Sequence, residues 1–140
     1  MHIDSIQNGV VLDHIQAGKS MEIYRLLNLD KLDCSVAIIK NVRSARHGKK
    51  DIIKIDSPLE PDLDVLGYID PNITVNIIKD GVRVEKKKLA LPKKLVNVIR
   101  CHNPRCITVA EPQLDVIFTL SDPEKRVYRC AYCETASGKK

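Results

Sequence analysis

Short runs of apolar residues, many of them β-branched, alternate with polar residues along the first 90 positions. A period of two is typical of strands that bury one face. Asn8 and Gly9 separate the first two runs, and an Asn-Gly pair favours a hairpin turn because both residues tolerate positive φ. The expected strands cover residues 3–7, 10–15, 35–42, 51–56, 73–78 and 82–87.

Two segments have apolar residues at helical spacing instead. Residues 21–29 are expected to form an amphipathic helix with Ser20 as its N-cap. A second helix, with Pro61 in its first turn, is expected to run to about residue 68. The order strands, helix, strands, helix, strands predicts an α+β fold, with a mainly antiparallel, ferredoxin-like sheet and two helices on one face.

The basic run at residues 86–94 separates a cysteine-poor part of the chain from a cysteine-rich part. We therefore expect one domain over residues 1–94 and a second over residues 95–140. The second domain is close to the size at which a small domain needs a metal, disulfides or a partner in order to fold.

Four cysteines in two close pairs mark the second domain: Cys101 with Cys106 and, after 23 intervening residues, Cys130 with Cys133. Two turns that each present two thiolates match the tetrahedral coordination of zinc, with each sulfur about 2.3 Å from the ion. Such a complete shell leaves no position for water or substrate, which predicts one structural zinc ion per chain rather than a zinc enzyme. The metal would stabilise a small all-β, zinc-ribbon-like domain.

Two further residues, His102 and Cys34, have side chains that could take part in site chemistry. His102 follows Cys101, but four thiolates already complete the shell, so we interpret it as a polar loop residue. Cys34 lies 67 residues from the next cysteine and shares strand parity with Val36. We expect Cys34 to be a reduced core thiol rather than a nucleophile.

The composition limits the class of protein and its partners. Of the 140 residues, 44% are apolar and 29% are charged, which is typical of globular proteins. The 23 Lys and Arg against 18 acidic residues give a net charge of +5, which favours anionic partners such as nucleotides, nucleic acid or an acidic protein surface. The chain has neither an apolar run near the roughly 20 residues of a membrane span nor a signal-peptide pattern, so we expect a cytoplasmic protein without membrane contact.

A candidate anion site combines residues of two expected strands. Lys50 and Lys54 share strand parity, which places their ammonium groups on one face about 13 Å apart at roughly 3.3 Å per residue. This spacing fits a polyphosphate and its sugar, although an ordinary solvated strand face has the same pattern. Asp13 and His14 could orient a ribose hydroxyl and a phosphate, or could be polar surface.

The register of the last hairpin decides whether Asn76 and Lys86 join that site. A two-residue turn at Asp80 and Gly81 would place them on opposite faces of the sheet. A three-residue turn, with Gly81 in the left-handed conformation, would return them to one face. The site hypothesis favours the three-residue turn.

Six stretches of the chain together resemble a known family, the regulatory chain of aspartate carbamoyltransferase. The resemblance covers nearly the whole chain. The stretches are VLDHI at 11–15, GKKDIIKI at 48–55, TVN at 74–76, ALP at 90–92, CHNPRCI at 101–107 and CAYCE at 130–134.

The resemblance implies a non-catalytic subunit with an N-terminal nucleotide-binding domain and a C-terminal zinc domain. In this family CTP inhibits and ATP activates by competing for one site, often with UTP acting alongside CTP. Regulatory chains pair as homodimers through their first domains and hold two catalytic trimers together through their zinc domains, in pyrimidine biosynthesis. Cys101, Cys106, Cys130 and Cys133 match the zinc ligands one for one.

The resemblance also assigns nucleotide contacts. Asp13 and Lys54 resemble ribose and base contacts. His14, Asn76 and Lys86 resemble triphosphate contacts. The full set of residues that match the family's nucleotide site is Ile3, Asp4, Ile6, Asp13, His14, Lys50, Lys54, Asn76 and Lys86.

Within that set, Ile3, Asp4 and Ile6 match the strand that lines the base. The chain departs from the family pattern at the last hairpin, where Gly81 and Arg83 replace an aromatic and an apolar residue. The alternative function is a zinc-ribbon protein that binds nucleic acid, which the positive charge would permit. No Trp, one Phe and four Tyr leave no aromatic cluster for base stacking, so we expect no nucleic-acid partner.

Overall fold

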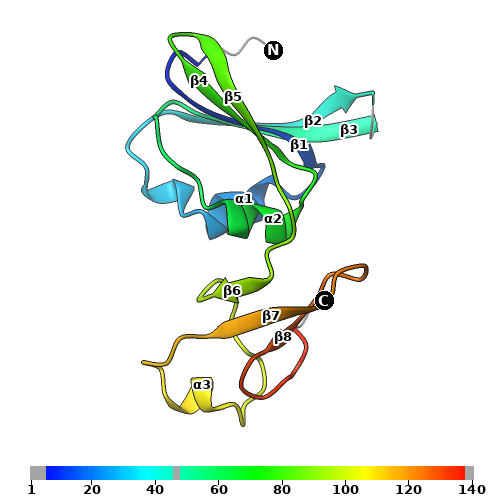
Figure 1. The fold of residues 1–140 in the computed structure, drawn as a ribbon. Helices are drawn as coiled ribbons and strands as arrows, with labels where there is room; N and C mark the ends of the chain where they lie inside the picture. The colour runs from blue at the N-terminus through cyan, green and yellow to red at the C-terminus, as the bar shows by residue number, and fades with distance from the viewer. Residues whose placement is uncertain (1–5, 46–47, 138–140) are drawn as a thin grey trace. The chain divides into compact units, whose positions relative to one another are not determined.

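The computed structural model describes residues 6–45 and 48–137, and the chain forms two compact units, Met1–Ala90 and Leu91–Lys140 (Figure 1). The division falls after Ala90 rather than after residue 94. Within the described ranges, no helix is long and apolar enough to cross a bilayer.

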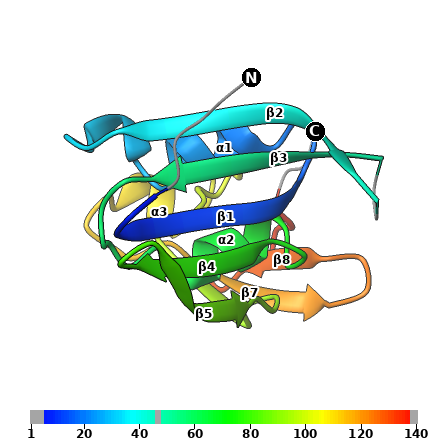
Figure 2. The same ribbon diagram turned by 90° about the horizontal axis from the view of Figure 1, so that it is seen from above.

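The first unit is a five-stranded antiparallel sheet with two helices on one face, which confirms the predicted fold class (Figure 2). The strand order is β2-β3-β1-β4-β5, the ferredoxin-like arrangement with one strand added at the edge. The elements are β1 (Gly9–Gln16), α1 (Ser20–Leu26), the 3-10 helix η1 (Leu29–Lys31), β2 (Val36–Ser44), β3 (Gly48–Ile55), α2 (Leu63–Ile69), β4 (Thr74–Lys79) and β5 (Val82–Lys88).

The sheet has one covered face and one open face. Along β1, Val10 and Leu12 are fully buried, whereas Val11 between them is half-buried. Ile23 of α1 and Leu66 of α2 are also fully buried and complete the core on the covered face. Each such side chain contributes about 1.5–3 kcal/mol through burial, so the alternation of β1 fixes which face packs on the helices.

A buried carboxylate ties three elements of this core together. Asp51 of β3 is fully buried and accepts hydrogen bonds from the backbone N–H groups of Gly18 (3.1 Å) and Asn41 (3.0 Å). Burial raises the pKa of Asp51, but the hydrogen bonds from Asn41, Ser20 and Gly18 together lower it by more, so the pKa lies below its usual value. The ionised Asp51 therefore fixes the turn after β1 and the stretch between Ile39 and Val42, where β2 has one extra residue opposite β3.

The predicted hairpin at Asn8 and Gly9 is wrong. β1 lies between β3 and β4 and pairs with both, so neither of its edges is open to a hairpin partner. The backbone around Asn8 instead meets the turn between β4 and β5: Gln7 O accepts a hydrogen bond from the Gly81 N–H at 2.8 Å. Ile3 and Asp4 lie outside the described residues.

Both predicted helices exist, but their starts differ from the prediction. Ser20 is not a cap: it is the first residue of α1 and is fully buried, and Lys19 precedes it. Pro61 lies outside α2, which begins at Leu63; Asp62 is its N-cap, because its carboxylate accepts hydrogen bonds from the N–H groups of Asp64 (3.0 Å) and Val65 (3.2 Å). A carboxylate at the N-cap satisfies amides that have no partner inside the helix.

The turn between β4 and β5 has two residues, so the predicted three-residue turn is wrong. Asp80 and Gly81 both have positive φ, 54° and 77°, and Lys79 pairs with Val82. These dihedrals are those of a type I′ turn, whose twist matches that of the flanking strands.

A β-bulge further along β5 places Asn76 and Lys86 on the same face of the sheet. With the two-residue turn alone, they would lie on opposite faces. Ile77 pairs with Glu85 but the next pair toward the turn skips Val84, which is the extra residue. One extra residue on a strand exchanges the faces of everything beyond it. Asn76 therefore pairs directly with Lys86, as the site hypothesis required.

The second unit contains a three-stranded antiparallel sheet in the order β6-β7-β8. Its core includes Leu95, Phe118 and Tyr128, each at most 1% exposed. The elements are β6 (Lys94–Val96), α3 (Ile107–Ala110), β7 (Ile117–Asp122) and β8 (Val127–Cys130).

Candidate functional site

A row of paired residues crosses the open face of the first unit. Lys54 of β3 pairs with Val11 of β1, Val11 pairs with Asn76 of β4, and Asn76 pairs with Lys86 of β5. Residues directly opposite each other on antiparallel strands point to the same face. With neighbouring strands about 4.8 Å apart, the two lysines are separated by roughly 14 Å at the backbone.

Asn76 lies in the middle of this row and has an unsatisfied acceptor. The residue is 9% exposed, and its Nδ2 approaches the carbonyl oxygen of Val11 at 3.5 Å. Among the residues that the structure describes, no donor reaches the buried Oδ1. A buried acceptor without a partner costs about 1–3 kcal/mol, so the row is incomplete without a group from outside.

Asp13 and Lys50 form an ion pair on the same face. Lys50 Nζ lies 2.9 Å from Asp13 Oδ1, and the backbone N–H of His14 donates to the same oxygen at 2.6 Å. Burial raises the pKa of Asp13, but the Lys50 ammonium and the His14 N–H lower it by more than burial raises it. The pKa therefore lies below its usual value and the carboxylate stays ionised. Asp13 is therefore a fixed, charged hydrogen-bond acceptor.

A bulge in β1 turns His14 onto the open face. Two residues, Asp13 and His14, face one residue of β3, and His14 has a left-handed φ of 59°. In a regular strand these neighbours would point to opposite faces. Here Nδ1 of the His14 ring is hydrogen-bonded to Oγ1 of Thr74 at 3.1 Å. Thr74 is the residue of β4 that pairs with Asp13.

Two residues of this face had no signal in the sequence. Thr74 and Lys88 pair directly, and Thr74 pairs with Asp13, so Lys88 shares the open face with Lys86. The sequence does not show which of the four basic residues of β5 lie on the open face, because neighbouring residues of a strand point to opposite faces. The register of the bulged strand decides it.

A hollow of about 520 Å³ adjoins His14 at the end of β1. Its one buried carboxylate, Asp70, is occupied by the N–H groups of Gln16 (3.3 Å) and Asn72 (2.9 Å). The hollow lies where the end of β1, the start of β3 and the segment after α2 come together. It is lined by His14, Gln16, Ala17, Gly48, Lys49, Asp70 and Asn72.

The segment before β1 contributes Ile6, which is half-buried beside Gly9. A Cβ on Gly9 would collide with the carbonyl oxygen of Ile55, so glycine permits this close approach. At the far hairpin, Gly81 faces the side chain of Gln7, where an added Cβ would lie 3.1 Å from Oε1.

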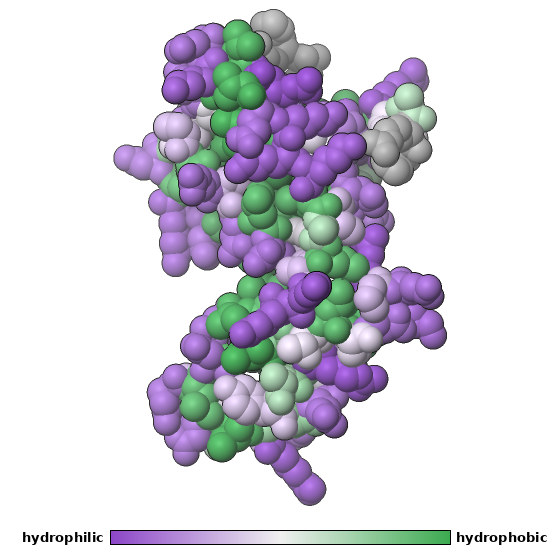
Figure 3. All heavy atoms as spheres, in the orientation of Figure 1, coloured by the Kyte–Doolittle hydropathy of each residue, from purple (hydrophilic) through white to green (hydrophobic). Residues whose placement is uncertain are grey.

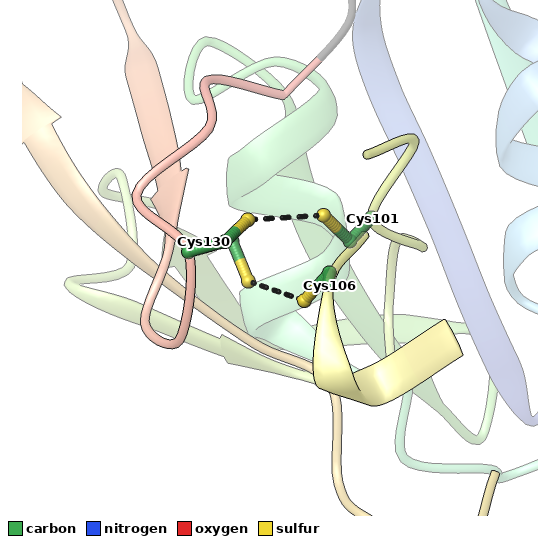
Figure 4. A group of neighbouring side chains, drawn as sticks. Cys101, Cys106 and Cys130 are labelled. Atoms are coloured by element: carbon green, nitrogen blue, oxygen red, sulfur yellow. Dashed lines mark hydrogen bonds between the residues drawn. The ribbon is translucent and has the colours of Figure 1, made fainter. Parts of the chain in front are cut away.

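The second unit brings its four cysteines to one point. Their sulfur atoms all lie within 4.8 Å of one another, with 3.5 Å between Cys101 and Cys133 and 3.7 Å between Cys106 and Cys130. Figure 4 shows Cys101, Cys106 and Cys130 directed toward a common centre. Four sulfurs each 2.3 Å from a tetrahedral ion would be about 3.8 Å apart, so the donor set and its spacing fit zinc.

Neighbouring groups divide the four thiols into two kinds. Burial raises the pKa of Cys101 to about 12 and also raises that of Cys130. Hydrogen bonds from Thr108 lower the pKa of Cys106, and those from Thr135 lower the pKa of Cys133 to about 6. The two hydroxyls lie 3.1 Å and 3.3 Å from the respective sulfurs, where they can orient thiolates that bind a metal.

The remaining candidates lie outside both clusters. His102 is exposed and does not belong to the metal cluster. Cys34 precedes β2 and is only half-buried, so it is not a fully buried core thiol. Figure 3 shows apolar atoms exposed among hydrophilic ones on the second unit, where Val96, Ile107, Val109 and Tyr132 are 43–51% exposed.

Comparison with known proteins assigns each unit. Residues 1–90 match the family model of the aspartate carbamoyltransferase regulatory chain, allosteric domain. Residues 93–140 match that of the aspartate carbamoyltransferase regulatory chain, metal binding domain.

Similar whole proteins are named aspartate carbamoyltransferase regulatory chain. The Clostridium botulinum (strain Hall) protein is 51% identical over 132 residues, which cover 94% of this chain and 90% of the relative. The Clostridium tetani protein is 51% identical over 133 residues, covering 94% and 92%. The Bifidobacterium longum protein is 45% identical over 134 residues, covering 96% of each.

Proposed function

Because the chain belongs to the family of aspartate carbamoyltransferase regulatory chains, we propose that it senses CTP and ATP on the open face of its first unit and docks to catalytic trimers through its second. It is a regulatory, non-catalytic subunit of a pyrimidine-biosynthesis enzyme, and four cysteines hold one structural zinc ion per chain. CTP is the proposed inhibitor and ATP the proposed activator, in competition for one site. The proposed location is the cytoplasm.

The row of Lys54, Asn76 and Lys86 is the observation that supports nucleotide binding best. The two ammonium groups flank a buried amide whose Oδ1 has no donor among the described residues. Lysines are suited to the negative charge of phosphates, and the orphaned oxygen suits a ligand hydroxyl or amine. A nucleoside triphosphate carries all of these groups within a length comparable to the row.

The proposed roles come from the family resemblance, and the strand pairing of the open face supports them. Asp13 stays ionised and accepts from ribose hydroxyls, while Lys50 holds it in place through their 2.9 Å ion pair. His14, Asn76 and Lys86 bind the triphosphate, Asn76 through the second hydrogen of its Nδ2, while its Oδ1 accepts from a ligand hydroxyl or amine. Lys54 contacts the ribose and base, and the family resemblance alone assigns Ile3, Asp4 and Ile6 to the lining of the base.

Calorimetric titration tests this proposal directly. We expect CTP and ATP each to bind at one site per chain and to displace one another. A single-stranded oligonucleotide should not bind tightly. Tight, strongly salt-dependent oligonucleotide binding without nucleotide binding would instead support the alternative, a zinc-ribbon protein that binds nucleic acid.

We further propose that the regulatory homodimer forms through the β2 edge of the sheet. Val36–Ser44 opens with four half-buried apolar residues and, in the described chain, pairs only with β3. The other edge strand, Val82–Lys88, carries five charged residues in a row of seven. Charged edges resist strand pairing, and β2 has only Lys40 and Arg43 among its nine residues, so β2 is the edge better suited to a second copy.

An Ile39→Lys substitution should therefore convert the dimer to a monomer, since it places a charge in the proposed interface. The matched control is Val84→Lys on β5, at a position already 58% exposed, which should leave the dimer intact. Sedimentation equilibrium distinguishes the outcomes. A dimeric Ile39→Lys protein, or dissociation caused by Val84→Lys, would contradict the assignment.

A further inference from the structure

The strand that carries Lys86 leads directly into the second unit. β5 ends at Lys88, and β6 begins at Lys94. Pro92, between them, is already buried and belongs to the second unit. Residues 89–91 are therefore the whole length of chain between the last site strand and the first fixed residue of the zinc-binding unit.

Tyr128 fixes that first residue. Its hydroxyl donates a hydrogen bond to the Pro92 carbonyl oxygen at 2.7 Å, and its side chain is fully buried. One residue later, the carbonyl oxygen of Lys93 accepts from the Leu120 N–H at 2.9 Å. Tyr128 lies on β8, two residues before the cluster ligand Cys130, so the same short strand holds both the metal and the connector.

The chemistry of this contact distinguishes tyrosine from phenylalanine. The ring alone would fill the core, but a buried phenol needs hydrogen-bond partners, and the connector backbone at Pro92 supplies one of them. Without the hydroxyl, the Pro92 carbonyl must lose its protein partner or move toward water. Tyr128 thus determines where the connector stops being free and becomes part of the second unit.

We propose that Tyr128 is a positioning residue for regulation, because it anchors the connector so that a change in β5 on nucleotide binding reaches the catalytic trimers. This inference rests on the proposed function. A ligand shifts an equilibrium between two states of a protein only if it binds one state better than the other. If the connector were free to move at Pro92, a shift of β5 would move the connector alone and would leave the second unit unchanged.

The test compares Tyr128→Phe with the unsubstituted chain, each assembled with catalytic trimers. We expect zinc content, assembly, activity without nucleotide and CTP affinity to be unchanged. The change in activity caused by CTP or ATP should shrink by about fivefold, the lower end of usual coupling factors. Hydrogen exchange at the Lys93 and Lys94 amides should accelerate.

Phe118→Leu is the matched control, because it removes volume from the same core without touching the connector. It should leave the nucleotide response intact, so equal loss in both variants would reduce Tyr128 to a general stabilising role and overturn the inference. A full response in Tyr128→Phe would also overturn it.

A second variant guards against loss of zinc in Tyr128→Phe. Insertion of two glycines after Ala90 lengthens the connector and leaves Tyr128 in place, and it should weaken the response in the same way. A full response from that insertion would overturn the inference. If the unsubstituted assembly itself ignores CTP and ATP, the proposed function fails and the inference fails with it, whereas a responsive assembly with insensitive variants refutes the inference alone.

Discussion

Replacement of Cys106 by serine should release the zinc ion and unfold residues 91–140, while the first unit keeps its fold. Serine is a poor ligand for zinc, and three thiolates cannot close the shell. Structural zinc contributes roughly 10–16 kcal/mol of apparent folding free energy in small domains. A three-stranded sheet over a core built on Leu95, Phe118 and Tyr128 is too small to compensate for that loss.

Metal analysis and hydrogen exchange resolved by residue would measure this outcome. The variant should contain no zinc, lose protection in β6–β8, keep protection in β1–β5 and bind CTP normally, yet fail to hold catalytic trimers together. Cys34→Ser is the matched control, since Cys34 is outside the cluster, and it should behave like the unsubstituted chain. An intact assembly formed by Cys106→Ser would contradict the role assigned to the zinc-binding unit.

Alanine at Lys54 or Lys86 should weaken nucleotide binding by about 10–100-fold, since each substitution removes a charge-assisted contact of about 1.5–3 kcal/mol. Zinc content and assembly should not change, because both side chains lie on the open face of the first unit. Calorimetric titration with CTP and CMP separates their roles. Lys86→Ala should reduce CTP affinity more than CMP affinity, whereas Lys54→Ala should reduce both equally.

Lys87→Ala is the control that tests the register itself. Lys87 adjoins Lys86 but pairs with the buried Val75, so it points to the covered face of the sheet. Its removal should leave CTP affinity within a few-fold of normal. Equal losses in Lys86→Ala and Lys87→Ala would show that only general positive charge matters and would contradict the proposed row of contacts.

The metal centre was predictable because its signal is local. Two close pairs of cysteines specify two turns, and two turns suffice to enclose a tetrahedral ion. The covered face of the sheet was equally legible, since Val10 and Leu12 alternate with half-buried or polar neighbours. In both cases the residues that form the pattern are close together in the sequence, so the pattern can be read without knowledge of distant contacts.

The open face was less predictable, because two bulges set it. His14 joins Asp13 only through the bulge in β1, and Lys86 joins Asn76 only through the extra residue Val84. The position of a bulge depends on how the strand pairs with strands that are distant in the sequence. The residues at these two positions do not predict a bulge. A three-residue turn would also have placed Asn76 and Lys86 on one face, but the turn has two residues and the bulge at Val84 does so instead.

Long-range contacts account for the other differences. The Asn8-Gly9 pair has the composition of a hairpin turn, but β1 is flanked by β3 and β4, which come much later in the chain. Neither Asp51 nor Tyr128 stands out in the sequence as a candidate site residue. Their importance comes from the backbone groups they meet, at Gly18 and Asn41 and at Pro92, which no periodicity reveals.

The central claim is that one chain senses nucleotides with a sheet and grips an enzyme with a zinc-bound unit. The most direct measurement is to mix the purified chain with catalytic trimers of its own organism and follow both molecular mass and carbamoyltransferase activity. We predict a larger complex whose activity CTP lowers and ATP raises. Trimers that stay separate, or a complex whose activity neither nucleotide alters, would contradict the claim.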